Sequence, residues 1–535
     1  MADKLKKILS SIMVVLLLMI CLYPCRRILE RKSSRFKYDP FFSRAKDIDV
    51  LLMGSSHVIN GIYPMELWKE YGITSYNFGG HANTLPTCYW MLENALDYAN
   101  PEIVVIDCYH LGTMLKATTH FEYIHQSFDA FPLTTTKVRA VFDLLDDPEM
   151  VKKSERGELE YPIQKRAKMD LLWDFAAYHS RWTDLEEIDF QPKKTSEYGA
   201  ELKIRAAEPA EPIPNPGTIH GEDDRTTGMV YLEKMIGECR DRGIEPVLTF
   251  LPFPVISERD WIDANTAERI ADRFQVKYIN FLEMDLVDFE TDCLDADSHL
   301  NPSGGGKVTR YLGKYLSEEC GAADHRNDPR YSCWDEDYDS YRAYAAEKLS
   351  ETQRLKYYLM MLTDRKYDFI ICAGGDALTQ DEELRKFLIA RGFLPEQLIE
   401  DTDYLFACGD SCSCLQADTK EEGNFLSQLQ RSGKDSSDNS SEKDSSSEKD
   451  SSSEKGKEDS LSVSEGSSIA VRPEEDGTCA IRIGENKTFR MESNMLETRD
   501  RYIKITVFEP GRSEEPVDAA VFHKPHRSYE RENGS

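Results

Sequence analysis

Two segments far apart in the chain carry the residue types that nucleophilic catalysis needs. A Gly-Ser-Ser-His motif begins at Gly54, and an Asp-Ala-Asp-Ser-His motif begins at Asp295. A serine cannot attack a carbonyl at neutral pH without a base, and a histidine base needs an acidic group that orients it. We therefore expect a serine of the first motif to be a nucleophile, His299 its base, and Asp297 or Asp295 the orienting acid.

The choice between the two aspartates depends on the local shape of the chain. Asp297 is separated from His299 by one residue, which puts both side chains on the same face of an extended segment. Asp295 would reach the imidazole only through a turn. We prefer Asp297 and expect the other carboxylate to accept hydrogen bonds from backbone amides.

Backbone amides that could hold an oxyanion are expected near the serine. The amide of Ser56 lies in a tight turn after an apolar run, and Gly79-Gly80 ends the next run. The missing side chains let backbone N–H groups approach a substrate there. We therefore expect Ser56, Gly80 and Gly79 to supply the oxyanion hole.

Between residues 47 and 316, apolar runs alternate with amphipathic helical patterns, which indicates a parallel sheet covered on both faces. Both motifs would then lie at strand ends, where ligands bind in such sheets. An insertion at about residues 110–226 interrupts the pattern, as either a substrate-shaping lid or a solvated excursion. We expect strands at 49–53, 75–78, 102–107, 246–251 and 276–281, and helices at 85–98, 136–145, 228–242, 261–274 and 307–316.

A second pattern follows a polar stretch near residues 320–338. A tract at 432–468 repeats Lys, Asp, Ser and Glu, which cannot bury a core, so we expect a disordered loop there. The expected domains are an anchor (1–37), an α/β domain (38–324), a smaller mixed α+β domain (338–523) and a tail (524–535). In the third of these we expect helices at 341–362 and 381–392 and strands at 367–372, 480–483, 502–508 and 518–522.

The first 37 residues predict a membrane anchor. Basic residues precede the uncharged run from Ile8 to Cys25, whose 18 residues just span a bilayer core of ~30 Å. No small-residue cleavage site follows, so we expect an uncleaved, single-pass signal anchor. The flank after the run is more basic than the one before it, which argues against an exported body.

Composition excludes several classes of protein. The sequence has 66 basic and 96 acidic side chains, a net charge of −30, which disfavours nucleic-acid binding. The 13 cysteines are too sparse for a disulfide scaffold and form no CxxC pair, so we expect incidental thiols, no metal site and no cofactor. Three histidines (His81, His110, His125) are expected to be ordinary polar or core residues, and Asp107 a strand-end cap.

The serine turn, the glycine pair and the late Asp-x-Asp-Ser-His-Leu-Asn-Pro-Ser-Gly segment together resemble the SGNH/GDSL hydrolase superfamily. Within it, the chain is most similar to membrane-anchored bacterial members related to polysaccharide O-acetyltransferases and D-alanyl-transfer proteins. The resemblance covers roughly residues 47–316. It implies Ser56 as nucleophile, His299 as base and Gly80 as an oxyanion donor beside the Ser56 amide.

Three departures from that family pattern bear on activity. Ser55 stands where the family has Asp, the Gly-x-Asn-Asp block is missing after the third strand, and Ala296 occupies the usual acid position. In an alternative, purely structural interpretation, the segment that begins at Asp295 only starts a helix, with Asn301 or Ser303 as its N-cap. The third oxyanion donor is therefore unassigned.

The C-terminal part resembles an interleukin-like EMT inducer domain over about residues 341–523, on the strand at 367–372, Gly374-Gly375-Asp376 and the strand at 502–508. This implies a compact β-rich module, and related stem domains bind carbohydrate.

Two functions follow. The first is a membrane-anchored serine esterase or O-acyltransferase that acts on acyl esters of a cell-envelope polysaccharide. Its expected partners are an acylated carbohydrate or acyl donor and polysaccharide-assembly proteins. Its catalytic domain is expected outside the cytoplasm. The second is a catalytically inactive glycan-binding or assembly protein of the same fold.

Overall fold

The computed structural model describes most of the chain. The described residues are 2–30, 32–157, 165–173, 177–190, 197–221, 223–363, 367–393, 402–409, 412–418, 469–474, 476–483, 487–496, 502–524 and 530–532. Two compact units divide at Ala343, just past the expected start of the second domain at residue 338. The serine-rich tract at 432–468 lies outside the described residues.

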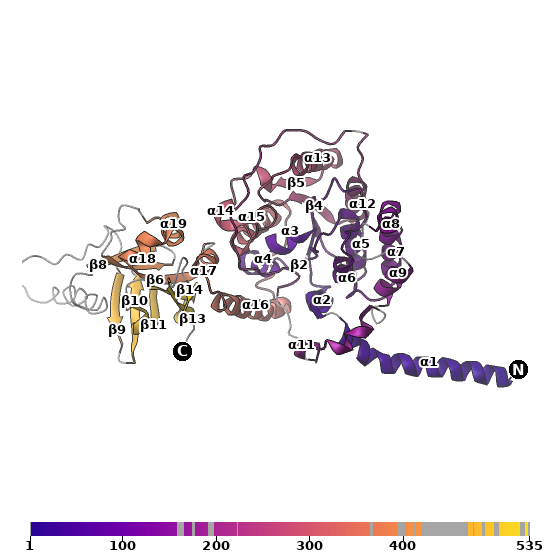
Figure 1. Cartoon of the computed structure of the whole chain (residues 1–535), viewed down its shortest axis with the longest axis horizontal. Coiled ribbons are helices and arrows are strands. Elements are labelled where there is room, and N and C mark those ends of the chain that lie inside the picture. Colours follow the sequence, from indigo (N-terminus) through magenta and orange to yellow (C-terminus); the bar gives the residue numbers. More distant parts are fainter. Residues whose placement is uncertain are drawn as a thin grey trace, which may run out of the picture. The chain divides into compact units, whose positions relative to one another are not determined.

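The first unit contains a five-stranded parallel sheet in the order β2-β1-β3-β4-β5. Strands β2, β4 and β5 of this sheet are labelled in Figure 1. Side chains alternate across a strand, so consecutive residues of β1 lie in different apolar clusters. Leu51 belongs to the cluster on one face of the sheet, and Leu52 belongs to the cluster on the other face. Apolar runs without alternation therefore form strands that are buried on both faces, and the expected parallel sheet is confirmed. The strands are β1 (Val50–Met53), β2 (Ser75–Asn77), β3 (Ile103–Asp107), β4 (Glu245–Phe250) and β5 (Lys277–Asn280).

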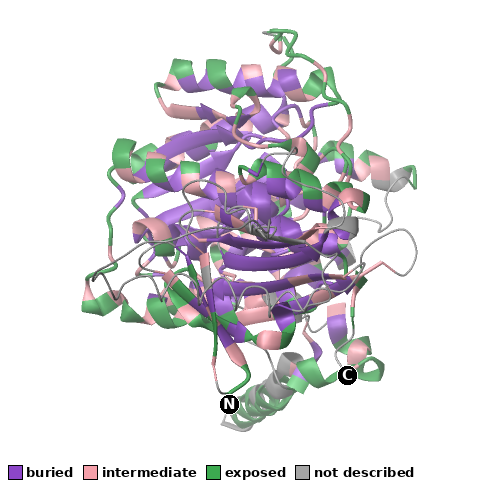
Figure 2. Ribbon diagram, turned by 90° about the vertical axis from the view of Figure 1, so that its left-hand side faces the viewer, coloured by how far each residue is buried: buried purple, intermediate pink, exposed green. Residues whose placement is uncertain are grey.

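Helices cover both faces of this sheet. One face carries α3 (Ser56–Gly61), α4 (Pro64–Tyr71) and α15 (Pro302–Glu319), which share a core with alternate strand residues. The other carries α5 (Leu85–Leu96) and α12 (Thr227–Asp241), and α13 (Glu258–Phe274) follows β4. In Figure 2 the strands are mostly buried, while the helices turn exposed faces outward.

The insertion is partly helical. Helix α7 packs against α5 and α9, and the expected helix at 136–145 is confirmed. The described helices of this region are α6 (Phe121–Phe128), α7 (Thr135–Leu145), α8 (Pro148–Glu155), α9 (Lys165–Leu172), η1 (His179–Thr183) and α11 (Glu187–Phe190). Two short elements, η2 (Phe281–Glu283) and α14 (Phe289–Asp292), precede α15.

The chain begins with helix α1 (Ala2–Leu29), which contains the apolar run, and continues with α2 (Lys32–Arg44). Tyr38 and Phe41 of α2 are buried, and both rings lie against the ring of Phe78, the residue directly after β2. Helix α2 is therefore part of the α/β unit. No helix in the described part of the chain combines the length and the apolar character that a membrane span requires.

The second unit contains a six-stranded antiparallel sheet, β14-β13-β12-β6-β7-β8, and a three-stranded sheet, β11-β10-β9. The expected strands at 367–372, 480–483, 502–508 and 518–522 fall in β6, β10, β12 and β13. The strands are β6 (Asp368–Gly374), β7 (Thr402–Cys408), β8 (Cys412–Asp418), β9 (Ile469–Pro473), β10 (Thr478–Ile483), β11 (Lys487–Glu492), β12 (Tyr502–Glu509), β13 (Arg512–His523) and β14 (Glu530–Arg531).

The single helix expected at 341–362 was wrong, because two helices occupy that region. The Thr352 hydroxyl donates to the Lys348 carbonyl and so competes with the backbone amides for that helical acceptor. The first helix therefore ends near Thr352. The helices are η3 (Pro329–Tyr331), α16 (Ser332–Ser350), α17 (Leu355–Met361), α18 (Gly375–Gln380), α19 (Glu382–Ala390) and η6 (Ser493–Leu496).

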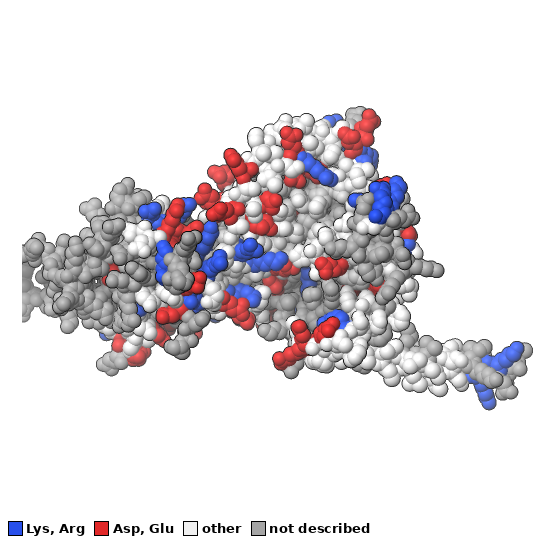
Figure 3. All heavy atoms as spheres, in the orientation of Figure 1, with Lys and Arg blue, Asp and Glu red and all other residues white. Residues whose placement is uncertain are grey.

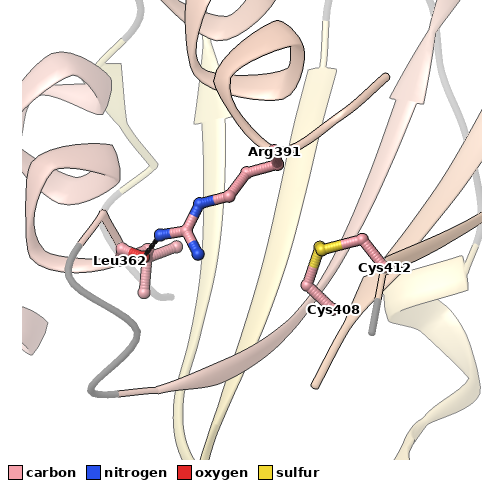
Figure 4. Close-up of a disulfide and its surroundings, with 4 residues drawn as sticks. All are labelled: Leu362, Arg391, Cys408 and Cys412. Atoms are coloured by element: carbon pink, nitrogen blue, oxygen red, sulfur yellow. Dashed lines mark hydrogen bonds between the residues drawn. A yellow bond between two sulfur atoms is a disulfide. The ribbon is translucent and has the colours of Figure 1, made fainter. Parts of the chain in front are cut away.

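A disulfide joins Cys408 to Cys412 across the β7–β8 hairpin (Figure 4). Nearby, the Arg391 guanidinium donates to the Leu362 carbonyl. The expectation of incidental thiols was wrong for this pair, because the hairpin makes the two cysteines direct strand partners. Among the described residues, no group of His, Cys, Asp and Glu is arranged to hold a metal ion.

Candidate active site

Ser56 lies where the strand order of the first sheet reverses. It is the first residue of α3, just beyond β1. The chain passes from β1 to β2 on one side and then crosses back to β3 on the other side of β1. Ser55 caps the helix, its Oγ accepting a hydrogen bond from the His57 amide at 3.3 Å. Open parallel sheets bind their ligands at such a reversal. The local sequence therefore places the Ser56 hydroxyl at the expected binding edge.

The hydroxyl of Ser56 is in contact with the histidine of the second motif. His299 Nε2 lies 2.7 Å from Ser56 Oγ, and His299 Nδ1 lies 2.5 Å from Asp295 Oδ2. Both distances are within the reach of hydrogen bonds. The structure thus brings together Ser56, His299 and Asp295 in the order nucleophile, base and acid.

The preference for Asp297 as the orienting acid was wrong. The Cys293–Leu300 bridge closes the intervening residues into a loop, so the segment reverses direction and is not extended. As a result Asp295, four residues before His299, faces the imidazole. Asp297 accepts a hydrogen bond from the Ser298 hydroxyl at 3.1 Å instead.

Asp295 also accepts hydrogen bonds from two backbone amides. The amides of Ser298 and His299 donate to its Oδ1 at 3.0 and 2.8 Å. Burial alone would raise the pKa of Asp295, but the hydrogen bonds from His299 and Ser298 lower it to about 2. The carboxylate is therefore charged at any working pH and fixes a proton on Nδ1 of the imidazole.

The two glycines expected as oxyanion donors have their amides engaged elsewhere. The Gly79 amide donates to Asn77 Oδ1 at 2.9 Å, and the Gly80 amide donates to the Gly54 carbonyl at 3.2 Å. The expectation that both supply the oxyanion hole was therefore wrong for this structure. The Ser56 amide, in the free first turn of α3, has no hydrogen-bond partner among the described residues and can point at a substrate oxygen.

The glycine pair instead lets two backbone segments approach closely. A Cβ on Gly79 would lie 2.7 Å from the Ile59 amide nitrogen and 2.8 Å from the Ser55 carbonyl oxygen. Both atoms belong to backbone around the nucleophile, which cannot move aside cheaply. Gly79 therefore permits the second strand end to press against the serine turn.

Gly79→Ala is expected to destabilise the first unit by roughly 1–3 kcal/mol, because the added methyl group overlaps backbone atoms. The matched control is Gly237→Ala, whose Cβ meets nothing within 4 Å in helix α12 and should stabilise by up to about 1 kcal/mol. All 6 tryptophans lie in the first unit, so urea unfolding followed by tryptophan fluorescence reports on it alone. Equal stability of the two variants would contradict the close contact.

Part of the insertion lies along the site. Residues 197–213, here called the strap, run without helix or strand. The Ala210 amide donates to the Ala296 carbonyl at 2.7 Å, between the two candidate aspartates, and the Glu201 amide donates to the Ile59 carbonyl at 3.1 Å. The strap therefore holds both the acid–histidine loop and the nucleophile helix, which favours the substrate-shaping interpretation of the insertion over a solvated excursion.

The sequence did not predict the three aromatic rings that lie beside Ser56 and His299, which are those of His57, Tyr109 and Phe253. His57 is buried, with its ring centroid 3.9 Å from Tyr109, 4.8 Å from Phe253 and 5.4 Å from His299. Burial, and then the neighbouring His299 and His110, hold the pKa of His57 well below its usual range. The only sequence signal was the position of His57 directly after Ser56. A neutral His57 leaves the wall of the site uncharged beside the base.

The other singled-out residues have structural partners. Asp107 accepts a hydrogen bond from the Leu251 amide at 3.1 Å, and burial raises its pKa to about 7, so it is a strand-end cap as expected. His81 pairs with Glu201 and His125 with Asp129. Asn301 caps helix α15 through the amides of Ser303 and Gly304, so the second motif starts a helix and also presents His299 to Ser56.

Comparison with known proteins adds no family to this geometry. No model of a known protein family matches the sequence, and no curated protein matches it.

Proposed function

We propose that the chain is a serine esterase or O-acyltransferase with Ser56 as its nucleophile. The observation that carries the proposal is the continuous hydrogen-bonded series from Asp295 through His299 to Ser56 Oγ. The strand order and the position of Ser56 after β1 also support the resemblance to SGNH/GDSL hydrolases. A structural role alone would not require a charged carboxylate, an imidazole and a hydroxyl in this order.

In the proposed reaction, Ser56 Oγ attacks the carbonyl carbon of an acyl ester while His299 Nε2 takes the serine proton. Asp295 stabilises the imidazolium that forms, and the Ser56 amide donates to the developing oxyanion. The tetrahedral intermediate collapses, the ester C–O bond breaks, and His299 protonates the leaving alkoxide. Water then releases the acyl group from Ser56 as an acid, or a sugar hydroxyl accepts it as a new ester.

The proposed substrate is an acyl ester of a cell-envelope polysaccharide, and the proposed location is the cell membrane. Apolar side chains of α1 are exposed, Leu17, Leu18 and Ile20 by 53%, 57% and 67%. Figure 3 shows basic side chains at the N-terminal tip of α1 and uncharged side chains along the described part of the apolar run that follows. The Cys408–Cys412 disulfide supports an oxidising compartment, outside the cytoplasm.

This location predicts that protease added to intact cells digests the chain beyond residue 37, with only the anchor protected. Detergent-permeabilised cells serve as the control. Protection of the whole chain until permeabilisation would place the catalytic unit in the cytoplasm, as the basic flank after Cys25 suggests, and would contradict an envelope substrate.

A second candidate is a catalytically inactive glycan-binding or assembly protein of the same fold. The engaged amides of Gly79 and Gly80 favour it, because they leave the Ser56 amide as the one assigned oxyanion donor. For the second unit, we propose the interleukin-like EMT inducer resemblance as its fold, supported by its antiparallel sheets, without assigned binding residues.

The test is turnover of p-nitrophenyl acetate by the full-length protein in detergent, with and without an oligosaccharide acceptor. We expect saturable release of p-nitrophenol, and mass spectrometry of the acceptor distinguishes transfer from hydrolysis. His299→Gln should remove the activity, whereas His125→Gln, whose native side chain pairs with Asp129 in the insertion, should retain it. Folded wild-type protein that releases no more p-nitrophenol than buffer would favour the binding protein.

A further inference from the structure

A lysine from the segment after α1 reaches the backbone behind the nucleophile. Lys37 of α2 donates from Nζ to the Gly79 carbonyl oxygen at 2.5 Å. The position of this lysine is fixed on both sides: its own carbonyl accepts a hydrogen bond from the Tyr76 hydroxyl, and the next residue, Tyr38, is buried in the core. The contact is therefore held by the packing of α2 and does not depend on a freely moving side chain.

The carbonyl that Lys37 binds belongs to the peptide group joining Gly79 to Gly80. The N–H of the same peptide group donates to the Gly54 carbonyl at 3.2 Å, two residues before the nucleophile. A cation on the oxygen of a peptide group polarises that group and strengthens the hydrogen bond that its N–H donates. Lys37 and the serine turn are thus linked through one shared peptide group.

We propose that Lys37 is a positioning residue for Ser56, acting through the Gly79–Gly80 peptide group on the backbone of the serine turn. This inference deepens the proposed function and rests on it for its catalytic consequence. It also gives α2 a role in the active site: the segment that connects the apolar helix to the α/β unit sets the geometry of the nucleophile.

The charge state of Lys37 makes the proposal testable by pH. Burial lowers the pKa of Lys37 to about 8, and the nearby carboxylates of Glu201 and Glu197 oppose this only in part. The ammonium is therefore present below pH 8 and is lost as the pH rises through 8, so turnover should fall on that alkaline side. The charged groups that act on Lys37 are Glu197, Glu201 and Lys203 from the strap. The Tyr76 hydroxyl of the second strand donates to the Lys37 carbonyl, and His81, after that strand, pairs with Glu201.

The first experiment measures the pH dependence of kcat in the full-length protein. Lys37→Met should lower kcat roughly 10- to 100-fold at pH 7 with KM little changed, because a small displacement of a nucleophile is costly, and the decline above pH 8 should disappear. Lys37→Arg should retain more activity and move the decline to higher pH, since a guanidinium stays charged. The matched control is Lys314→Met, which also removes one lysine charge from the first unit, at an exposed pair with Glu318 on the surface of α15.

The second experiment measures hydrogen exchange and does not require activity. Lys37→Met should speed amide exchange in the peptides that contain Gly54 and Gly80, and Lys314→Met should not. Wild-type kcat and an unchanged decline above pH 8 in Lys37→Met would overturn the proposal, and so would unchanged exchange. If the wild-type protein has no turnover, the proposed function fails, while the exchange result still decides whether Lys37 holds the serine turn.

Discussion

Replacing Ser56 by alanine is expected to lower turnover of p-nitrophenyl acetate by about 10⁴- to 10⁶-fold, since it removes the hydroxyl that His299 activates and that takes up the acyl group. His299 Nε2 would then lie opposite a methyl group in place of the hydroxyl that is 2.7 Å away. The loss should appear in kcat, with little change in stability, because the side chain contributes no cap to α3.

The control for this substitution is the neighbouring serine. Ser55→Ala removes the hydroxyl that caps α3, which should cost about 1 kcal/mol of stability and leave Ser56 chemically intact. Comparable turnover of the Ser56→Ala and wild-type proteins would show that another group is the nucleophile.

Replacing Asp295 by asparagine is expected to lower kcat by about 10⁴-fold, because the amide no longer fixes the imidazole tautomer that accepts the serine proton. The structure predicts a sharp asymmetry with Asp297→Asn, which loses only a hydrogen bond from the Ser298 hydroxyl and should keep most of the wild-type kcat.

The two aspartate variants are well matched, since each removes one charge from the same loop. Both should be compared by circular dichroism and by thermal unfolding before kinetics. Mild, nearly equal losses in the two variants would exclude both residues as the orienting acid, and a larger loss in Asp297→Asn would contradict the contact between Asp295 and His299.

Much of the first unit could be predicted from the sequence, because its strands are apolar without alternation. A run such as residues 102–107 has few structures available to it other than a strand buried on both faces. The serine turn and the acid–histidine loop then follow strand ends, so their proximity needed only the topology of a parallel sheet. This is why Ser56 and His299 could be paired across 243 residues.

The details of the site depend on hydrogen bonds that residue types do not specify. An extended segment favours Asp297 over Asp295 as the orienting acid. The segment is instead folded into a loop by the Cys293–Leu300 bridge and by the hydrogen bond from the strap to Ala296. The sequence does not reveal the acceptors of the two glycine amides, which are Asn77 Oδ1 for Gly79 and the Gly54 carbonyl for Gly80. Both amides were therefore expected to be available to a substrate.

Contacts between residues far apart in the chain could not be predicted from the sequence either. Lys37 lies in a basic flank that the sequence assigns to membrane topology, and only the packing of α2 against the second strand brings it to Gly79. The break at Thr352 and the Cys408–Cys412 hairpin in the second unit likewise depend on local competition and strand pairing.

The most direct test of the central claim is the site of covalent labelling by a serine-directed fluorophosphonate. The full-length protein should be incubated with the probe, digested and analysed by mass spectrometry, with Ser56→Ala and Ser55→Ala in parallel. The account predicts one adduct on Ser56 that is absent in Ser56→Ala, retained in Ser55→Ala and slowed by Asp295→Asn. Folded wild-type protein that carries no adduct on Ser56, or that is labelled at another serine, would contradict the account.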